Sequence, residues 1–391
     1  MNYILFDGTV RDQLLPFTYT RPVADIRVGI ITIREKWEKV LGSTITTVTE
    51  DYLTEKFPMI ELAENVLINA SFLPSEDLVN KIQQLSENQA IFIDDEPIAF
   101  HAMEGQEVDF DSYEIETYTN AEIFRIQNTW DIFALNHAAI AQDFDLLTHG
   151  RTSQPIPDSV FTVHPERIFI EEGASLPLCS LNASDGPIYI GKNAEIMEGC
   201  LVRGPFALCE GATLKMGAKV YTGTTVGPYS KVGGEVSNSV IFGYSNKGHD
   251  GFLGNSVIGE WCNLGADTNI SNLKNNYAEV RLWDYGSERF ARTGLQFCGL
   301  MMGDHSKCGI NSMFNTGTVV GVSANIFGSG FPRNFIPSYS WGGSSGTTTY
   351  LTKKAFEVAQ VVMARRGIEF TETDAKLLEH VFEETKKWRR D

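Results

Sequence analysis

A branched aliphatic residue stands at every sixth position between residues 190 and 232, without a miss. The members of this series are Ile190, Ile196, Val202, Leu208, Leu214, Val220, Val226 and Val232. Because 42% of the chain is hydrophobic, such a run in a fixed frame arises by chance about once in a thousand trials. A six-residue period fits neither an amphipathic helix nor an alternating strand. It is typical of a parallel β-helix built from hexapeptides, and it predicts the architecture of half the chain.

The repeat continues beyond residue 232 in two further frames. One frame contains Phe252, Ile258, Leu264 and Ile270, and the other contains Met302, Cys308, Phe314, Val320 and Ile326. An earlier pair, Ile170 and Leu176, indicates that the solenoid starts near residue 165. Each inward side chain stacks on those of adjacent coils, and its burial is worth about 1.5–3 kcal/mol. A single coil cannot bury this face alone, so we expect a long stack.

The change from a mixed pattern to hexapeptides near residue 160 marks a domain boundary. We predict an α/β domain over residues 1–160, a left-handed parallel β-helix over 161–345 and a short helical tail over 346–391. The first domain shows strand-like runs at 3–6, 66–68 and 90–93 and helix-like stretches at 75–85 and 129–147. The tail reads as two helices broken near Gly367, with Thr371 as an N-cap.

Charge and cysteine content exclude several classes of partner. The formal net charge of −18 argues against non-specific nucleic-acid binding, which requires a cationic surface. The six cysteines include no CxxC pair and no zinc-like spacing, so we expect free thiols in a reducing compartment. The sequence shows neither a signal-peptide pattern nor an apolar stretch that could cross a membrane, and we expect a cytoplasmic location without a membrane partner.

The segment from Gly8 to Val23 resembles the signature loop of sugar-1-phosphate nucleotidyltransferases, which reads G-x-G-T-R, a short spacer, P-x-T and then P-K. The resemblance implies UTP or another NTP as substrate, Mg²⁺ as a candidate ion, and nucleotide contacts from Gly8, Thr9, Arg11 and Arg21. Phe6 replaces one glycine of the family pattern, and Val23 replaces its lysine. Asn69 ends a strand where the family carries a metal-binding aspartate, so no metal ligand is assigned. The alternative for Arg11, Arg21 and Arg27 is that they are solvated loop residues.

A second resemblance lies in the β-helix. The chain contains Gly248-His249, then Phe252, Leu253-Gly254-Asn255, Asn263-Leu-Gly-Ala266-Asp267 and Asn272. This pattern is similar, without a gap, to the acetyltransferase domain of the bifunctional N-acetylglucosamine-1-phosphate uridyltransferase/glucosamine-1-phosphate acetyltransferase family. That family reads G-H, an aromatic residue three positions later, L-G-D, N-x-G-A-G and a further asparagine.

The resemblance implies specific roles for these residues. His249 takes the place of the general base that deprotonates the sugar amine before it attacks acetyl-CoA, and Glu235 matches the acidic residue that orients this histidine. The backbone N–H of Ala266 matches an oxyanion donor. The remaining matches are sugar contacts, namely Phe252 in place of a tyrosine, Asn263 and Asn272.

The cationic sugar-phosphate contacts of the family match less well. One position is Ser237 here, and the other falls near Lys219 or Lys231, depending on where a gap is placed. Lys274 is a further candidate contact for the substrate, and it lies in a break of the repeat over residues 271–296 that also carries three arginines. Arg333, among aromatic residues after the last coil, is a candidate contact for the phosphates and adenine of CoA, or else it caps the solenoid.

Repeat geometry adds an expectation of its own. Three hexapeptides make one coil, so residues 18 apart stack about 4.8 Å from each other. Asp267 lies 18 positions after His249, and we expect it one rung from the general base. There it would stabilise the charged imidazole or contact the acceptor amine. His305 lacks a comparable context and is interpreted as structural.

Three functions remain in competition. The leading hypothesis is an acetyl-CoA-dependent N-acetyltransferase acting on an amino-sugar phosphate, with glucosamine-1-phosphate as the favoured acceptor and a nucleotidyltransferase-like domain that could form UDP-N-acetylglucosamine. The first alternative is a sugar-1-phosphate nucleotidyltransferase with a structural β-helix. The second is a non-catalytic scaffold that binds sugar nucleotides. Because insertions in such solenoids often cover the site of a neighbouring subunit, we expect a homotrimer.

Overall fold

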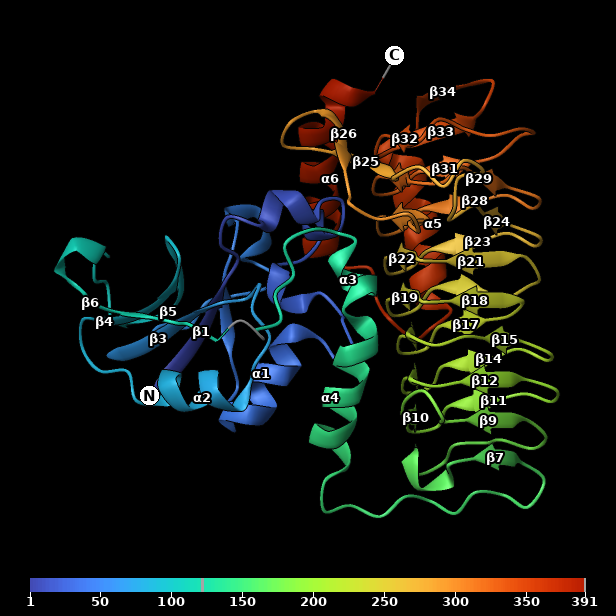
Figure 1. The fold of residues 1–391 in the computed structure, drawn as a ribbon. Coiled ribbons are helices and arrows are strands. Elements are labelled where there is room, and N and C mark those ends of the chain that lie inside the picture. The colour runs from blue at the N-terminus through green and yellow to red at the C-terminus, as the bar shows by residue number, and fades with distance from the viewer. Residues whose placement is uncertain (121–122, 390–391) are drawn as a thin grey trace.

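A computed structural model describes residues 1–120 and 123–389 of the chain. Figure 1 shows an N-terminal domain beside a tall solenoid, whose strands form a ladder from β7 at the bottom to β34 at the top. Two C-terminal helices lie against the upper half of this ladder. The predicted fold class, an α/β domain followed by a parallel β-helix and a helical tail, is confirmed.

The N-terminal domain is built on a six-stranded mixed sheet with the order β2-β1-β3-β5-β4-β6. Its strands are β1 Asn2–Phe6, β2 Thr46–Val48, β3 Glu64–Asn69, β4 Gln89–Ile93, β5 Glu96–Met103 and β6 Glu114–Thr117. Its helices are α1 Ile33–Leu41, α2 Glu76–Gln83, α3 Asp131–Ala134 and α4 Asn136–Thr148. The predicted strands and helices of this domain are therefore present. β1 pairs in parallel with β2 and β3, so the loops after β1 and β3 lie at one edge of the sheet.

Short 3₁₀ segments connect these elements, and two more occur later in the chain. They span Arg11–Leu14, Phe17–Tyr19, Val23–Asp25, Asp51–Leu53, Phe110–Ser112, Pro165–Arg167 and Thr385–Trp388. The first three lie in the loop after β1, so the segment that resembles a phosphate-binding loop is tightly folded.

The solenoid has three faces. One face, here called the domain-facing sheet, lies toward α4 and contains β8 Ile168–Ile170, β10 Ile188–Ile190, β13 Phe206–Leu208, β16 Thr224–Val226, β19 Val240–Ile241, β22 Val257–Ile258, β27 Leu300–Met302, β30 Thr318–Val320 and β32 Phe335–Ile336. The helix-facing sheet contains β11 Glu195–Ile196, β14 Thr213–Leu214, β17 Lys231–Val232, β20 Asn246–Lys247, β23 Asn263–Leu264, β28 Lys307–Cys308, β31 Asn325–Ile326, β33 Ser340–Gly343 and β34 Gly346–Thr349. The open face contains β7 Phe161–Val163, β9 Ser180–Asn182, β12 Leu201–Arg203, β15 Lys219–Val220, β18 Glu235–Ser237, β21 Phe252–Gly254, and the pair β24 Asn269–Ile270 and β29 Met313–Phe314.

The aliphatic series predicted from the sequence fills the interior of the solenoid. All eight residues from Ile190 to Val232 are buried, and so are the five from Met302 to Ile326. The frame between them needs a correction, because Leu253 is the buried residue of β21 while Phe252 points outward beside Glu235. The cause is a change in coil length. Val226 pairs with Ile241 and Ile241 pairs with Ile258, so these coils contain 15 and 17 residues rather than 18.

The two domains share a buried polar interface along α4. The amide of Asn136 donates to the carbonyl oxygen of Gly223 at 2.8 Å, and the Thr225 hydroxyl donates to the carbonyl oxygen of Gly29 at 2.8 Å. Nearby, the ammonium of Lys36 pairs with the buried carboxylate of Asp143. Since buried polar groups are costly to leave unpaired, these contacts fix the orientation of the domains.

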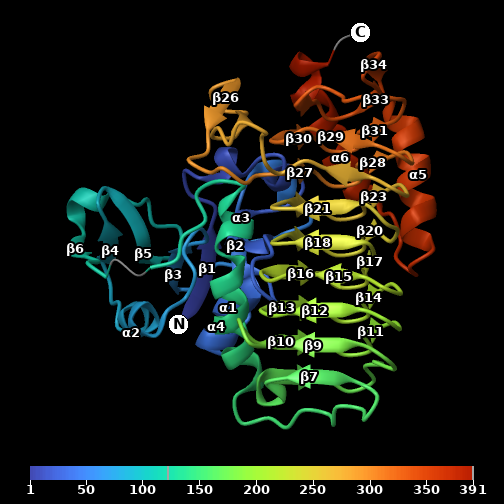
Figure 2. The ribbon, with the colours of Figure 1, turned by 45° about the vertical axis from the view of Figure 1, so that its right-hand side comes forward.

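The predicted tail over 346–391 contains α5 Thr352–Ala364 and α6 Glu372–Glu384, but Gly346–Thr349 at its start forms strand β34 of the helix-facing sheet. Thr371 caps α6 with a capping box, as predicted, because its hydroxyl accepts from the N–H of Asp374. Figure 2 shows α5 along the edge of the solenoid far from the N-terminal domain. All six cysteines are free and buried. Within the described residues, none of the helices is long and apolar enough to cross a membrane.

The predicted break in the repeat contains a hairpin, β25 Arg281–Asp284 and β26 Arg289–Arg292. This insertion packs within its own chain, because Tyr285 meets Tyr19 of the N-terminal domain edge-on at 5.5 Å. Tyr285 also contacts Trp388 beyond α6, with ring centroids 5.0 Å apart. The insertion therefore joins all three parts of one chain.

Candidate functional site

His249 lies at a corner of the solenoid, where the chain turns from β20 on the helix-facing sheet to β21 on the open face. Its side chain is exposed, and no hydrogen bond to its imidazole occurs within residues 1–120 and 123–389. The corners of successive coils stack, and Ala266 and Asp267 form the corner of the next coil. We call these three residues and Asp250 the His249 corner.

The stacking at this corner differs by one residue from the prediction. The N–H of Asp267 donates to the carbonyl oxygen of Asp250 at 3.1 Å, so Asp267 stacks on Asp250 rather than on His249. The 17-residue coil explains the shift, because Asn246 pairs with Asn263. Asp267 is nevertheless on the predicted rung, and its exposed side chain lies at the same corner as His249.

Ala266 has a backbone N–H that is not used in the sheet. Its carbonyl oxygen accepts from the N–H of Asn311 at 2.8 Å, whereas its own N–H has no partner among the described residues. A half-buried N–H without a partner, one coil from the histidine, is available to an anionic oxygen of a bound ligand.

Glu235 and Phe252 lie side by side on the open face, as register partners in β18 and β21. The carboxylate of Glu235 is 3.8 Å from the ammonium of Lys219, and no hydrogen bond between Glu235 and His249 is formed in the part of the chain that the structure describes. The N–H of Phe252 donates to the side-chain oxygen of Asn269 at 2.9 Å, which fixes the start of β21.

Lys247 contacts this site and was not predicted from the sequence. It pairs with the inward residue Val232, so its side chain starts inside the solenoid, where the repeat normally places an aliphatic residue. Its ammonium donates to the carbonyl oxygen of His249. Burial lowers the pKa of Lys247 to about 8. The sequence carries one indication of this position, since Lys247 lies six residues after Ile241, where the hexapeptide repeat places an inward side chain.

The other predicted sugar contacts are distributed around the solenoid. The amide of Asn272 donates to the side-chain oxygen of Asn255 at 2.8 Å, at the end of the open face. Asn263 and Lys231 lie instead on the helix-facing sheet. The ammonium of Lys274 donates to the carbonyl oxygen of Glu279 at 2.8 Å within the insertion.

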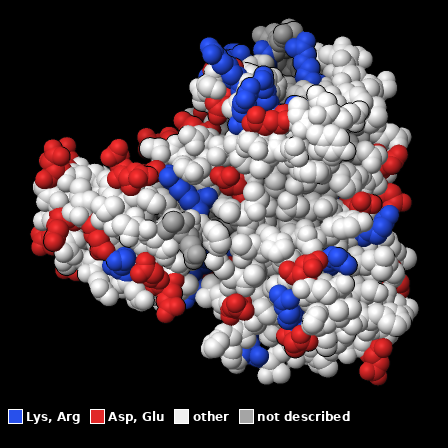
Figure 3. All heavy atoms as spheres, in the orientation of Figure 1, with Lys and Arg blue, Asp and Glu red and all other residues white. Residues whose placement is uncertain are grey.

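Arg333 lies far along the chain from this corner, at the C-terminal end of the solenoid. It lines a cavity of about 660 Å³ together with Trp283, Phe335 and Trp388. Figure 3 shows blue basic side chains gathered at this upper end, whereas red acidic side chains predominate over the N-terminal domain. The structure therefore separates Arg333 from the His249 corner by several coils.

A second polar cluster lies at the edge of the N-terminal sheet, after β1 and β3. The Thr9 hydroxyl and the Asn69 amide both donate to the carboxylate of Glu96, each at 3.2 Å, and the guanidinium of Arg125 pairs with the same carboxylate. Gly8 has a φ of +64°, and a Cβ there would lie 3.0 Å from the Asn69 amide. This close approach requires glycine.

The residues of this cluster do not fit a Mg²⁺ site. The Asn69 oxygen accepts from the Ser71 N–H and hydroxyl, and the Glu96 carboxylate is already paired with Arg125. Within the described residues, no group of three or more His, Cys, Asp or Glu side chains could hold a metal ion. Arg125 was not predicted as a member of this cluster, because it lies more than 50 residues after the segments that resemble the nucleotidyltransferase family.

Arg11 and Arg21 make buried structural contacts. Arg11 donates to the carbonyl oxygen of Thr18 at 3.0 Å and to the Tyr52 hydroxyl at 2.7 Å. Arg21 pairs with the buried carboxylate of Asp304 and lies 3.4 Å from Glu260, both on the solenoid. Both guanidinium groups are therefore engaged by the protein, which differs from the phosphate contacts expected.

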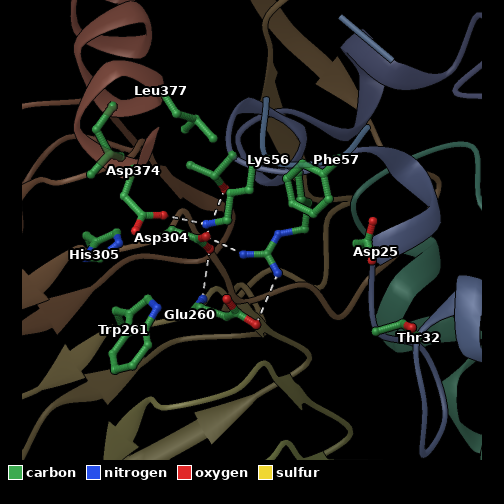
Figure 4. A pocket seen from close by; sticks show the side chains of 13 residues that line it. Asp25, Thr32, Lys56, Phe57, Glu260, Trp261, Asp304, His305, Asp374 and Leu377 are labelled. Atoms are coloured by element: carbon green, nitrogen blue, oxygen red, sulfur yellow. Dashed lines mark hydrogen bonds and ion pairs between the residues drawn. The ribbon is translucent and has the colours of Figure 1, made fainter. Parts of the chain in front are cut away.

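Arg21 lines a cavity of about 230 Å³ between the domains, which Figure 4 shows from close by. Lys56 pairs with Asp374 of α6 across the same cavity at 2.8 Å. His305 also lies in the wall of this cavity. Burial lowers the pKa of its imidazole well below the usual range. Since its cations are paired with carboxylates, we interpret this cavity as part of the interface that joins three segments of the chain.

Comparison with known proteins agrees with both resemblances. Residues 3–152 match the model of a family described as "Sugar nucleotidyl transferase". Over 232 residues the chain is 31% identical to a bifunctional sugar-1-phosphate nucleotidylyltransferase/acetyltransferase of Sulfurisphaera tokodaii, with 53% of this chain and 57% of that protein covered. The predicted resemblance is confirmed. The chain spans little more than half the length of this relative.

Two solved structures were also found to be similar. One is a UDP-N-acetylglucosamine acyltransferase of Arabidopsis, 16% identical with a TM-score of 0.25, over 55% of this chain and 80% of that one. The other is a UDP-N-acetylglucosamine acyltransferase of Francisella novicida, 13% identical with a TM-score of 0.29, over 59% of this chain and 85% of that one. Scores at this level inform neither the function nor the site.

Proposed function

We propose that this protein is a transferase that moves an acetyl group from acetyl-CoA to the amine of an amino-sugar phosphate, with glucosamine-1-phosphate as the favoured acceptor. One observation carries the proposal. The exposed side chain of His249 and the backbone N–H of Ala266, which has no partner in the described part of the chain, occupy stacked corners of the solenoid. Acyl transfer to an amine needs a base for the amine proton and a hydrogen-bond donor for the oxyanion. The relative named as an acetyltransferase adds support.

In the proposed reaction, His249 removes a proton from the acceptor amine, which attacks the thioester carbonyl carbon. The Ala266 N–H stabilises the oxyanion of the tetrahedral intermediate. The C–S bond then breaks, and the imidazolium returns its proton to the CoA thiolate. Lys247 acts as a positioning residue, because its ammonium holds the His249 carbonyl.

We assign supporting roles to the neighbouring residues. Phe252 would pack against the acceptor sugar, since it points outward from β21 next to Glu235. Asp267 would stabilise the charged imidazole from the same corner. Asp267→Asn should then alter the pH–rate profile of acetyl transfer, and an unchanged profile would remove Asp267 from the mechanism.

We further propose that the site is completed in a homotrimer. The corner that carries His249 also presents Met216, 71% exposed, and Ile310, 69% exposed. Exposed apolar side chains around a site favour a covering partner surface. Light scattering of the purified protein should give three times the chain mass, and a monomer at assay concentration with full activity would exclude a shared site.

The test of acetyl transfer is CoA release from acetyl-CoA with glucosamine-1-phosphate, with wild type and His249→Ala compared. His164→Ala is a matched control, because His164 is also an exposed histidine of the solenoid region. Loss of CoA release in His249→Ala alone supports the proposal. Ligand binding without any turnover in wild type would favour the non-catalytic scaffold.

A second activity, nucleotidyl transfer, is favoured by the family match over residues 3–152. The cluster of Gly8, Thr9 and Arg125 would provide its phosphate contacts, with Arg125 exchanging its ion pair with Glu96 for the phosphate. Pyrophosphate release from UTP and N-acetylglucosamine-1-phosphate should then fall in Arg125→Ala and persist in His249→Ala. Absence of pyrophosphate release in wild type would reduce the N-terminal domain to a binding or structural role.

A further inference from the structure

One column of outward side chains runs up the helix-facing sheet beneath α5. Lys231, Asn246, Asn263 and Lys307 are register partners in four consecutive coils, so they lie above one another. Three inter-strand spacings separate the two lysines, a distance of about 14 Å. Figure 2 shows α5 alongside these coils, and the four side chains line one cavity together with residues of α5.

A cavity of about 530 Å³ lies between this column and α5. It is lined by Lys231, Asn246, Trp261, Cys262, Asn263, Lys307, Val358, Val362, Arg365 and Arg366. Four of these side chains are cationic and none is acidic. A volume of this size is within the range of small-molecule sites.

None of the four cations forms an ion pair within residues 1–120 and 123–389. Arg366 donates to the Asn246 amide oxygen at 3.2 Å, and the Lys307 ammonium donates to the carbonyl oxygens of His305 at 2.7 Å and Trp261 at 3.4 Å. An ammonium has three N–H groups, so one N–H of Lys307 has no acceptor among the residues that the structure describes. Burial lowers the pKa of Lys307 to about 8, because the charged ammonium is removed from water and no carboxylate is paired with it in the described residues.

This concentration of unpaired positive charge contrasts with the rest of the protein, whose formal net charge is −18. The C-terminal end of α5 offers partial compensation, since a helix end carries roughly half a negative charge. Lys231 and Arg365 are exposed to solvent, whereas Lys307 and Arg366 are half-buried, and the charge of this second pair still exceeds that value. The mismatch points to an anionic ligand that supplies the remaining negative charge.

The cavity also provides an apolar wall. Val358 and Val362 project from α5, and the ring of Trp261 lies on the opposite side. Trp261 continues a stack of rings, because it lies 4.3 Å from Tyr244 at an interplanar angle of 8°. A ligand with both a phosphate group and a ring would satisfy both parts of the lining.

We propose that the cavity beneath α5 binds the phosphate end of a ring-bearing substrate of the acetyl-transfer reaction. The ligand is either the amino-sugar phosphate or the nucleotide part of CoA, which share this chemistry. The inference deepens the proposed function and rests on it for the identity of the ligand. The column begins beside the site, since Asn246 precedes His249 by three residues on the same coil.

The test is isothermal titration calorimetry of the full chain with glucosamine-1-phosphate and, separately, with CoA. Arg366→Ala should weaken binding of one of these probes about tenfold, the usual effect of losing one charge-assisted hydrogen bond. Lys307→Met should weaken the same probe, and it removes an enclosed charge, so loss of folding is not expected. Lys353→Ala is the matched control, because Lys353 is an exposed lysine of the same helix outside the cavity.

Each outcome decides the proposal. A selective loss for glucosamine-1-phosphate assigns the cavity to the acceptor, and a selective loss for CoA assigns it to the donor. Equal affinities in wild type, Arg366→Ala and Lys307→Met, or no binding of either probe to wild type, would overturn it. Failure of the proposed acetyl transfer gives a different result from failure of this inference. In that case wild type would bind a probe and lose binding in Arg366→Ala, but it would release no CoA in the activity assay.

Discussion

The ion pair between Arg21 and Asp304 joins the N-terminal domain to the solenoid, and replacing Arg21 by Met should weaken that attachment strongly. The Arg21 side chain is 7% exposed and the Asp304 side chain 5% exposed. Breaking a buried pair by removing one partner costs about 3–5 kcal/mol, because a buried charge is left uncompensated. Asp304 retains hydrogen bonds from the Thr20 hydroxyl and the Glu260 N–H, each at 2.8 Å, so we expect the lower end, about 3 kcal/mol.

The double variant Arg21→Met/Asp304→Asn should recover part of this loss, because it also removes the stranded carboxylate. Burial raises the pKa of Asp304 and the Arg21 guanidinium opposes that shift, so neutralising both groups is better tolerated than neutralising one. Urea unfolding followed by tryptophan fluorescence measures these differences. Arg203→Met is the control, since Arg203 meets Asp185 at 3.4 Å on the surface and should cost less than about 1 kcal/mol. A loss in Arg21→Met no larger than this control would refute the assignment of Arg21 to the interface.

Three further changes test the fold. Burial raises the pKa of the Asp7 carboxyl from 3.8 to about 6. The free energy of unfolding should therefore rise by about 3 kcal/mol as the pH falls from 7 to below 4, because the folded state binds the proton more tightly. Asp7→Asn should abolish this pH-dependent component, measured by urea titration at several pH values. Phe314→Ala should cost about 3–5 kcal/mol, since Phe314 is fully buried inside the solenoid; a loss below 1 kcal/mol by urea denaturation would contradict this packing. Thr371→Ala should cost about 0.5–2 kcal/mol by removing the capping box of α6, and an unchanged melting temperature would contradict it.

The solenoid was predictable because its signal is local and repeated. Each buried aliphatic residue from Ile190 to Val232 lies six positions after the last, and the sheet register follows that count. Thr371 was predictable for a similar reason, since a capping residue acts on the turn that follows it. The prediction was wrong at Phe252, because coils of 15 and 17 residues change the frame and place Leu253 inside.

The arrangement between distant segments could not be derived from the sequence. Arg21 and Asp304 are 283 positions apart, and neither residue type nor spacing indicates their pairing. The same holds for the cavity beneath α5, which Lys231 and Arg366 line together only because the tail folds back along the solenoid. The local resemblance to a phosphate-binding loop led us to expect a phosphate contact from Arg21. In the fold, Arg21 instead pairs with Asp304 of the solenoid.

The central claim is that His249 is the base of an acetyl transfer at a corner of the solenoid. The most direct test is the initial rate of CoA release with saturating acetyl-CoA and glucosamine-1-phosphate, measured for wild type, His249→Ala and His164→Ala. Loss of a general base lowers the rate by about 10²–10⁴-fold, so His249→Ala should fall by at least a hundredfold while His164→Ala retains the wild-type rate. Equal rates in wild type and His249→Ala would contradict the account.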